Sequence, residues 1–364
     1  MFQLQKWAIK QLDKVRRGFL WKGTDSVNGG NGLVQWKKLQ RPKKLGGLGV
    51  CDLERFSRAL RLRWLWFDWK ELDRPWVGSA LPVNDLDRQL FRVSTIVTIG
   101  NGEKAEFWEA SWLQGRAPRD IAPSLYKLAW RKHLKVKDQL LNQSWTRGLW
   151  RMSTVEEMAE FVALWDLVQN VQLTSEEDQI QWKWSADGMH SAKSAYEVQF
   201  KGSFCSFRPN HIWRAHAEGK HKFFTWLLVQ EKLLTADKLQ ARNWPCNPVC
   251  SLCSNHPETA THLCLHCPFA VEVWELVSGW LGGFVFVPTQ ELSIEDWWCE
   301  AITQQPKPER RKVAALLMYT VWNLWKERNR RIFEGKVANP RMVLQLITEE
   351  VNLRTRACGA PIVS

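Results

Sequence analysis

The spacing of apolar residues predicts a mainly α-helical chain. Apolar side chains recur at three- and four-residue steps over Leu4–Phe19, Asp52–Trp69 and Trp213–Trp244. That spacing gathers them on one helix face, because an α-helix turns once in about 3.6 residues. Asp52 stands where an N-cap is expected, since its carboxylate can accept hydrogen bonds from the first free backbone N–H groups.

Two regions predict short antiparallel strands. Apolar and polar residues alternate from Arg92 to Ile99, after which Gly100-Asn101-Gly102 turns the chain. We expect small antiparallel pieces from Ile99–Trp112 and from Lys183–Tyr196, the latter with a turn at Asp187-Gly188. The predicted fold class is therefore mainly α with short antiparallel β pieces.

The length of 364 residues is enough for two or three ordinary domains. We predict four segments along the chain. They are a basic segment at 1–115, an intermediate segment with short strands at 116–210, a segment around a cysteine–histidine cluster at 211–285, and a helical segment at 286–364.

Composition is that of a globular protein, with one departure. Hydrophobic residues make up 45% and charged residues 24%, which excludes a disordered tail. The departure is 24 tryptophans against 3 tyrosines. Tryptophan is large and carries an N–H that needs a partner when buried, so this number predicts Trp-rich cores, or else aromatic platforms for a partner.

The net charge of +13 is concentrated at the two ends. Met1–Lys70 holds 16 Lys and Arg against 5 Asp and Glu, Lys307–Arg356 holds 12 against 5, and the remaining residues sum to −5. Basic segments favour RNA or DNA, because each cation that neutralises a phosphate releases a counterion; the alternative is an ordinary solvated surface. Candidate phosphate contacts in the first segment are Arg16, Arg17, Lys43, Lys44, Arg55, Arg58 and Arg61.

Nothing in the sequence predicts export or membrane insertion. The first residues lack an apolar signal region, so we expect nuclear or cytoplasmic residence rather than secretion. The longest apolar stretch, Val313–Trp325, is too short to cross a bilayer, which needs about 20 residues. Five of the nine cysteines lie between Cys246 and Cys267, and without an export signal such a cluster predicts metal ligands rather than disulfides.

The cluster has the spacing Cys250-x2-Cys253-x8-His262-x4-Cys267. Zinc takes four thiolate or imidazole donors in a tetrahedron, and two residues between cysteines let both sulfurs point to one centre. These four are the predicted ligands. The alternatives are a set of buried thiols with a surface histidine, or a different donor from the nearby Cys246, His256, Cys264 and His266.

Pro268 predicts how the last two ligands converge. Five residues of ideal helix would leave His262 and Cys267 about 140° apart. Proline favours the first turn of a helix, so we expect a new helix from about Pro268 to Leu281, with Cys267 at its start. The result would be a small zinc knuckle between two helices. With all four positions filled by protein, the zinc would be structural rather than catalytic.

No catalytic motif accompanies this site. The sequence has no G-x-S-x-G elbow, no H-E-x-x-H helix and no Walker loop. Asp85 and Asp87 could be imagined as metal-binding carboxylates, but the preferred interpretation is a solvated, proline-flanked loop.

The cysteine–histidine run and its surroundings resemble a known family, the zinc-binding domain that follows reverse transcriptase in plant LINE-type (non-LTR) retrotransposons. The similar motifs near the ligands are Cys250-Ser251-Leu252-Cys253, Glu258-Thr259, His262-Leu263, Cys267-Pro268-Phe269 and Trp274. Those before them are Trp182-Lys183-Trp184, Lys193-Ser194-Ala195-Tyr196, Ile212-Trp213, Lys222–Leu227 and Thr235–Leu239. The resemblance extends over nearly the whole chain through further motifs at Arg17–Gly23, Pro42–Gly49, Gly100-Asn101-Gly102 with Phe107-Trp108, and Trp322–Phe333.

The resemblance implies a structural zinc on Cys250, Cys253, His262 and Cys267, and a role in engaging nucleic acid. It also implies that segment 1–115 joins the polymerase to the zinc domain. The family's polymerase carries a tyrosine followed by paired aspartates, and this sequence contains no such motif. We therefore expect a non-catalytic, post-polymerase part of a retrotransposon protein, without endonuclease or RNase H. The alternative is a protein-interaction or structural remnant with no nucleic-acid role.

Overall fold

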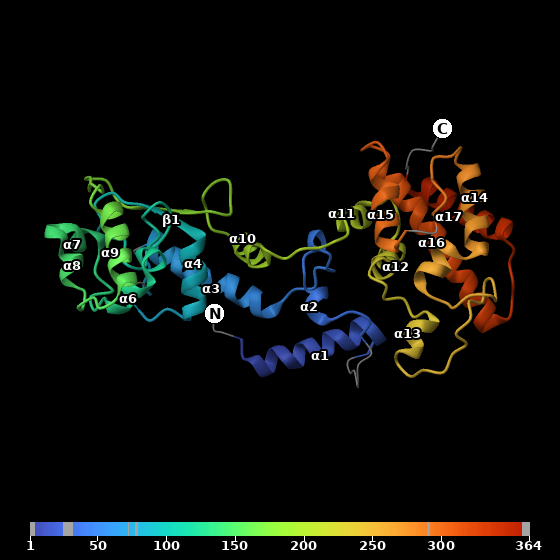
Figure 1. Cartoon of the computed structure of the whole chain (residues 1–364), viewed down its shortest axis with the longest axis horizontal. Coiled ribbons are helices and arrows are strands. Elements are labelled where there is room, and N and C mark those ends of the chain that lie inside the picture. Colours follow the sequence, from blue (N-terminus) through green and yellow to red (C-terminus); the bar gives the residue numbers. More distant parts are fainter. Residues whose placement is uncertain (1–3, 25–31, 72, 77–78, 290–291, 359–364) are drawn as a thin grey trace. The chain divides into compact units, whose positions relative to one another are not determined.

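The structure is a computed structural model that describes residues 4–24, 32–71, 73–76, 79–289 and 292–358 (Figure 1). The chain forms two compact units. Unit 1 is built mainly from Cys51–Gly202, with the start of the chain as far as Phe19. Unit 2 is built mainly from Ser203–Ser364, with Val27–Val50 added. No helix among the described residues is long and apolar enough to cross a membrane.

The predicted fold class is confirmed, because helices dominate both units and the described residues form one two-stranded antiparallel sheet. Strand β1 (Thr95–Thr98) pairs with β2 (Gln179–Trp182) so that Thr95 faces Trp182 and Thr98 faces Gln179. The predicted run from Arg92 contains β1, but its first residues end helix α4 (Asp85–Ser94).

The expected strand within Lys183–Tyr196 is wrong, although its turn is present. Gly188 has a φ of +68° and its carbonyl accepts the N–H of Trp182, so the chain does turn there. The strand precedes this turn. After it, Ser191 caps helix α10 (Ala192–Glu197) by accepting the N–H of Ser194 at 3.1 Å, and the helix replaces the second arm of a hairpin.

Unit 1 packs its remaining helices around a tryptophan-rich core. Phe107, Trp108, Trp145 and Trp182 are almost fully buried in it, which confirms the core interpretation of these tryptophans. The helices are α1 (Lys6–Lys22, which continues into unit 2), α3 (Leu53–Lys70), α5 (Pro118–Ile121), α6 (Pro123–Leu128), α7 (Val136–Leu140), α8 (Ser144–Arg147) and α9 (Val155–Val168), with short 3₁₀ turns at Leu141–Gln143 and Val198–Phe200. Helix α3 begins at Asp52 as predicted, because its carboxylate accepts the N–H groups of Glu54 and Arg55.

Asp85 and Asp87 lie in the first turn of α4 rather than in a loop, and Asp87 is buried in unit 1 while Asp85 is exposed, so the predicted solvated loop is wrong. Asn84 and Asp87 form a capping box at the start of α4. The Asp87 carboxylate is fully buried and accepts two hydrogen bonds from Arg61, at 2.7 and 2.9 Å. A buried charge of this kind needs such a partner, so Arg61 is drawn inward with it.

The Gly100-Asn101-Gly102 turn wraps around a buried carboxylate. Asp178 accepts the backbone N–H groups of Gly100, Gly102, Lys104 and Ala105 at 2.8–3.0 Å. A side chain at Gly100 would collide with the carbonyl of Glu176, and Gly102 has a φ of +72°. Both positions therefore require glycine, and Asp178 ties this loop to the start of β2.

Unit 2 is organised around helix α16 (Arg310–Glu334), which packs against six other elements. Trp226, Trp274, Trp297 and Trp298 are buried in its core. The indole N–H of Trp226 donates to the carbonyl of Gly46 at 2.9 Å, inside the glycine-rich turn of Pro42–Gly49. The other elements are α2 (Trp36–Leu39), the 3₁₀ turn Lys43–Leu45, α11 (Pro209–Arg214), α12 (Gly219–Val229), α13 (Ala236–Gln240), η4 (His262–His266), α14 (Pro268–Trp280), α15 (Ile294–Thr303) and α17 (Pro340–Cys358).

A polar network joins α12, α16 and α17 in unit 2. Glu350 of α17 accepts a hydrogen bond from Asn323 at 3.0 Å and pairs with Lys326 at 3.2 Å, and His221 Nε2 lies 3.5 Å away. Burial alone would raise the pKa of Glu350. The contacts with His221, Asn323 and Lys326 outweigh burial and lower this pKa to about 2.

We expect Asp178→Ala to destabilise unit 1 by about 3 kcal/mol or more, because it leaves four backbone donors without their acceptor. Urea unfolding followed by circular dichroism measures this. Glu177→Ala is the matched control, since the neighbouring Glu177 side chain is exposed and forms one surface ion pair, with Lys104. Equal stability of the two variants would contradict the structural role of Asp178.

We expect Glu350→Gln to lower the free energy of unfolding by roughly 1–3 kcal/mol at pH 7. The folded-state pKa is lower than the unfolded one, so the carboxylate stabilises the fold above about pH 5 and loses this effect as the pH falls toward about 2. The difference from wild type should therefore shrink over that window. Unfolding titrations at several pH values test this, with the exposed Glu349→Gln as control.

Candidate metal centre

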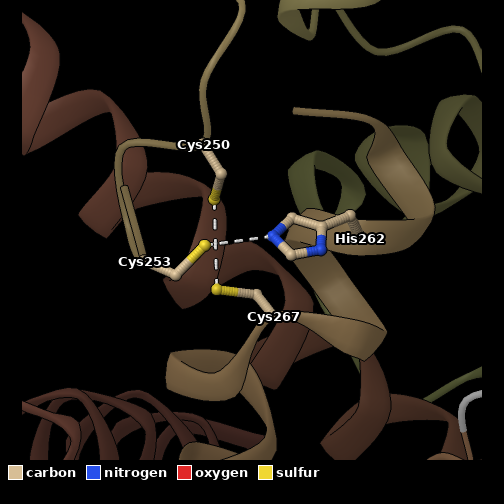
Figure 2. Close-up of side chains that lie close together, drawn as sticks. All are labelled: Cys250, Cys253, His262 and Cys267. Atoms are coloured by element: carbon tan, nitrogen blue, oxygen red, sulfur yellow. Dashed lines mark hydrogen bonds between the residues drawn. The ribbon is translucent and has the colours of Figure 1, made fainter. Parts of the chain in front are cut away.

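The first two predicted ligands lie on a tight turn. Val249 and Pro257 form an antiparallel bridge, and the N–H of Cys250 donates to the carbonyl of His256 at 2.8 Å. Within this loop the N–H of Ser254 donates a hydrogen bond to the carbonyl of Cys250 at 2.8 Å, and Ser254 has a φ of +56°. The turn places the Cys250 and Cys253 thiols on the same side of the chain (Figure 2).

The other two ligands come from a widened helical turn and the start of the next helix. η4 (His262–His266) is a π-turn, in which the N–H of Cys267 donates to the carbonyl of His262 at 2.7 Å, five residues back. Pro268 then begins α14, with Cys267 as its extended N-cap residue. The prediction that Pro268 starts a new helix is confirmed. The π-turn was not predicted, and it is what carries Cys267 round to the side of His262.

The four donor atoms lie where one zinc ion would need them. All are within 4.8 Å of one another. Cys250 Sγ and Cys267 Sγ are 3.9 Å apart, and Cys253 Sγ and His262 Nε2 are 3.3 Å apart (Figure 2). With Zn–S near 2.3 Å and Zn–N near 2.0–2.1 Å, a tetrahedron separates two sulfurs by about 3.8 Å and a sulfur and a nitrogen by about 3.6 Å. The cluster therefore fits tetrahedral zinc.

The cluster is partly shielded from solvent. Cys250 and Cys267 are fully buried, whereas Cys253 and His262 are half-buried. The hydrogen bond with Cys267 lowers the pKa of the Cys250 thiol well below its ordinary value, which favours a thiolate at this position. The same hydrogen bond, together with burial, raises the pKa of the Cys267 thiol, so one proton stays on the pair while no metal is bound. Because thiolates rather than thiols bind zinc, zinc binding would release that proton.

The alternative donors Cys246, His256 and Cys264 are not among the four clustered residues. Cys264 is fully buried, which raises the pKa of its thiol above the ordinary value, and its carbonyl accepts the indole N–H of Trp274 at 2.8 Å. Cys246 Sγ lies 3.5 Å from the carbonyl of Ala236. His256 is exposed, with Nδ1 4.0 Å from Cys253 Sγ. Among the residues that the structure describes, the predicted four form the one cluster suited to a metal ion.

Helix α16 braces the cluster from a distant part of the chain. Arg331 donates to the carbonyls of Ser251 and Leu252, the two residues between the paired cysteines, at 3.1 and 2.9 Å. One turn earlier, Arg328 donates two short hydrogen bonds to buried Glu258, which also accepts the N–H of Ala236. In the sequence, Arg328 and Arg331 lie within the family motif Trp322–Phe333, which did not predict a contact with the cluster. The signal it offered was two arginines three residues apart on one helix.

The candidate phosphate contacts on α3 are largely occupied. Arg55 donates to the carbonyl of Gln199 at 2.7 Å and lies over the Phe200 ring. Arg58 donates to the side chain of Gln199 at 3.1 Å. Arg61 is 3% exposed and paired with Asp87, so its guanidinium faces the interior rather than solvent.

The remaining candidates are divided between the two units. In unit 1, Arg16 bonds Asp13 and the carbonyl of Cys51, and Arg17 is exposed and donates to the carbonyl of Asp13. In unit 2, Lys43 and Lys44 are exposed, and Lys43 Nζ lies 4.9 Å from the Trp213 ring. No single unit brings all seven predicted residues together, and their role stays a prediction.

Comparison with known proteins agrees with this geometry. Residues 190–274, which include all four cluster residues, match the family described as zinc-binding in reverse transcriptase. Residues 190–274 thus form a zinc-binding domain of the reverse-transcriptase type, and the predicted resemblance to such a domain is confirmed for this range. The LINE-type origin stays a prediction. Arg328 and Arg331 lie beyond the matched residues.

The chain is also similar to a particular plant protein. An Arabidopsis thaliana protein described as a "putative ribonuclease H protein" is 25% identical over 304 residues, which cover 74% of this chain and 48% of that protein. The chain therefore spans about half the length of this relative. No solved structure matches the chain.

We expect one zinc ion per chain by elemental analysis of purified protein, and loss of zinc when Cys250, Cys253, His262 or Cys267 is replaced. His262→Ala and His256→Ala form a matched pair, because only His262 lies within the cluster. Chelation should unfold the structure around Cys250, since binding energy in such sites is folding energy. Full zinc content in His262→Ala would contradict the ligand set.

Proposed function

We propose that this chain is a non-catalytic, zinc-stabilised part of a non-LTR retrotransposon reverse-transcriptase protein, and that it binds RNA or DNA. The observation that carries the proposal is the family match over residues 190–274, with four zinc-compatible donors gathered inside it. The sequence motifs on either side of this range support the LINE-type origin.

Zinc has a structural role in this proposal. Four protein donors would fill a tetrahedral shell, which leaves no position for a reactive water. The ion would join the turn at Cys250 and Cys253 to the start of α14 at Cys267. Arg331 of α16, about 80 residues further along the chain, holds the same turn by hydrogen bonds, so the zinc-stabilised turn would also be tied to α16.

Nucleic-acid binding would depend on exposed cations. Lys6, Lys10, Lys14 and Arg17 are all exposed on α1, and Lys43 and Lys44 are exposed in unit 2. Exposed cations of this kind lie where the phosphates of a nucleic acid can reach them. We propose no catalytic step, because the sequence lacks the tyrosine and paired aspartates of the polymerase palm.

A specific observation supports the alternative of a protein-interaction role. Helix α1 exposes an apolar stripe beside its lysines, in which Trp7 is 70% and Phe19 76% exposed, and Leu12 and Val15 about half. Exposed apolar surface of this extent is typical of protein contacts. Nothing in the described residues identifies a protein that would cover it, so we keep nucleic-acid binding as the first proposal.

We expect the purified chain to retain radiolabelled RNA and DNA on filters at low salt, with affinity that falls as salt rises. The logarithm of the binding constant should fall linearly with the logarithm of salt, with a slope near −0.7 per phosphate contact for single strands. No retention at low salt, or retention independent of salt, would refute nucleic-acid binding and leave the protein-contact alternative.

A further inference from the structure

A basic cluster lies inside the otherwise acidic middle of the chain. Residues 127–151 contain seven Lys and Arg and a single acidic residue, Asp138. The same stretch carries two exposed tryptophans, Trp130 at 50% and Trp150 at 66%. Most other tryptophans of unit 1 are buried or half-buried, so these two are available for a role outside the core.

Backbone pairing holds the two tryptophans close together. Ala129 and Leu149 form an antiparallel bridge, the N–H of Trp130 donates to the carbonyl of Gly148, and the N–H of Trp150 donates to the carbonyl of Leu128, both at 3.0 Å. Side chains alternate between the two faces of such a pair. Ala129 faces the core at 4% exposure, so Trp130 and Trp150 both lie on the outer face.

The support beneath this pair is rigid. Trp145, in helix α8 just before Leu149, is 1% exposed and stacks on Phe107 with ring centroids 5.8 Å apart. The bridge joins the residue after α6 to a residue just after α8, in the part of the chain that is green in Figure 1. The outer tryptophans are thus carried on a packed scaffold rather than on a free loop.

An exposed arginine directly follows each of these tryptophans in the sequence. The Arg131 guanidinium lies 4.3 Å from the ring centroid of Trp130, and its Cβ lies near Gly148. Arg151 follows Trp150, and Arg147, three residues before Trp150, is also exposed. Among the described residues, none of these three arginines pairs with a carboxylate. Their charge is therefore available to an external anion.

We propose that this aromatic–basic face, defined as Trp130, Arg131, Arg147, Trp150 and Arg151, binds single-stranded nucleic acid. Unpaired bases would stack on Trp130 and Trp150, and the arginines would contact phosphates. The face suits a single strand better than a duplex, because duplex bases already stack on each other and do not offer their planes to a protein. The inference deepens the proposed nucleic-acid role and rests on it.

The test is fluorescence anisotropy of the full chain with a labelled oligouridine and with a duplex RNA of equal phosphate number. We expect Trp130→Ala with Trp150→Ala to weaken oligouridine binding roughly 10- to 100-fold and duplex binding much less, since alanine removes the stacking surface. Trp130→Phe with Trp150→Phe should retain most of the affinity, because phenylalanine still stacks. Trp244→Ala, an exposed tryptophan of unit 2, is the control and should bind as wild type.

The arginines are tested separately by their effect on salt dependence. Replacement of Arg131, Arg147 and Arg151 by Gln should reduce the salt slope for oligouridine by about 2, at roughly 0.7 per lost phosphate contact. Thermal melting checks that each variant is folded, which is expected because all five side chains are exposed.

The outcomes separate the two proposals. If wild type binds neither of these RNAs and retains no DNA in the filter assay, the proposed function fails and this inference fails with it. If wild type binds oligouridine but the Trp→Ala pair binds it equally well, the proposed function stands and this inference is wrong. In a third outcome, polyglutamate competes with the labelled oligouridine as strongly as unlabelled oligouridine does, and equally in the Trp→Ala pair. That result would identify an acidic protein surface as the partner and would also overturn the inference.

Discussion

The hydrogen bond from the N–H of Cys267 to the carbonyl of His262 determines whether the zinc domain can have a metal centre at all. In a regular α-helix these two residues would point in directions about 140° apart. The π-turn adds one residue to that turn, and Pro268 starts the next helix, so the Cys267 thiol meets Cys250 while His262 meets Cys253. A single π-turn therefore brings together ligands that a regular α-helix would separate, and π-turns are often found at functional sites.

The cluster is not a self-contained knuckle. Leu252 of its paired-cysteine turn is buried in the core of unit 2, two carbonyls of the turn accept hydrogen bonds from Arg331, and Glu258 beside it pairs with Arg328. Both arginines lie on α16, outside the matched residues 190–274. The cooperative structure that zinc would stabilise is consequently larger than the family match, and the basic motif near residue 330 has a structural purpose that its charge alone would not indicate.

Charge in this chain divides into interior and surface roles. Arg61 and Arg328 form ion pairs with the buried carboxylates of Asp87 and Glu258. Removal of either partner would leave an unpaired charge in the interior. Arg131, Arg147 and Arg151 remain exposed beside two outward tryptophans. A net charge summed over segments hides this division, because it counts paired and free cations alike. The middle of the chain is acidic in sum but carries an exposed basic cluster in residues 127–151.

The sequence by itself determined the features that depend on neighbours within a turn or two: the helical class, the cap at Asp52, the turn at Gly188, the helix start at Pro268 and the four cysteine and histidine residues of the cluster. Only the tertiary structure decided which strand pairs with which across more than 80 residues, that Asp178 fills the Gly100–Gly102 turn, that Arg61 lies inside, and that Trp130 and Trp150 lie outside. The physical reason is that burial and long-range hydrogen bonding are set by what the rest of the chain brings to a residue. Spacing along the sequence records only what that residue's own helix or turn requires.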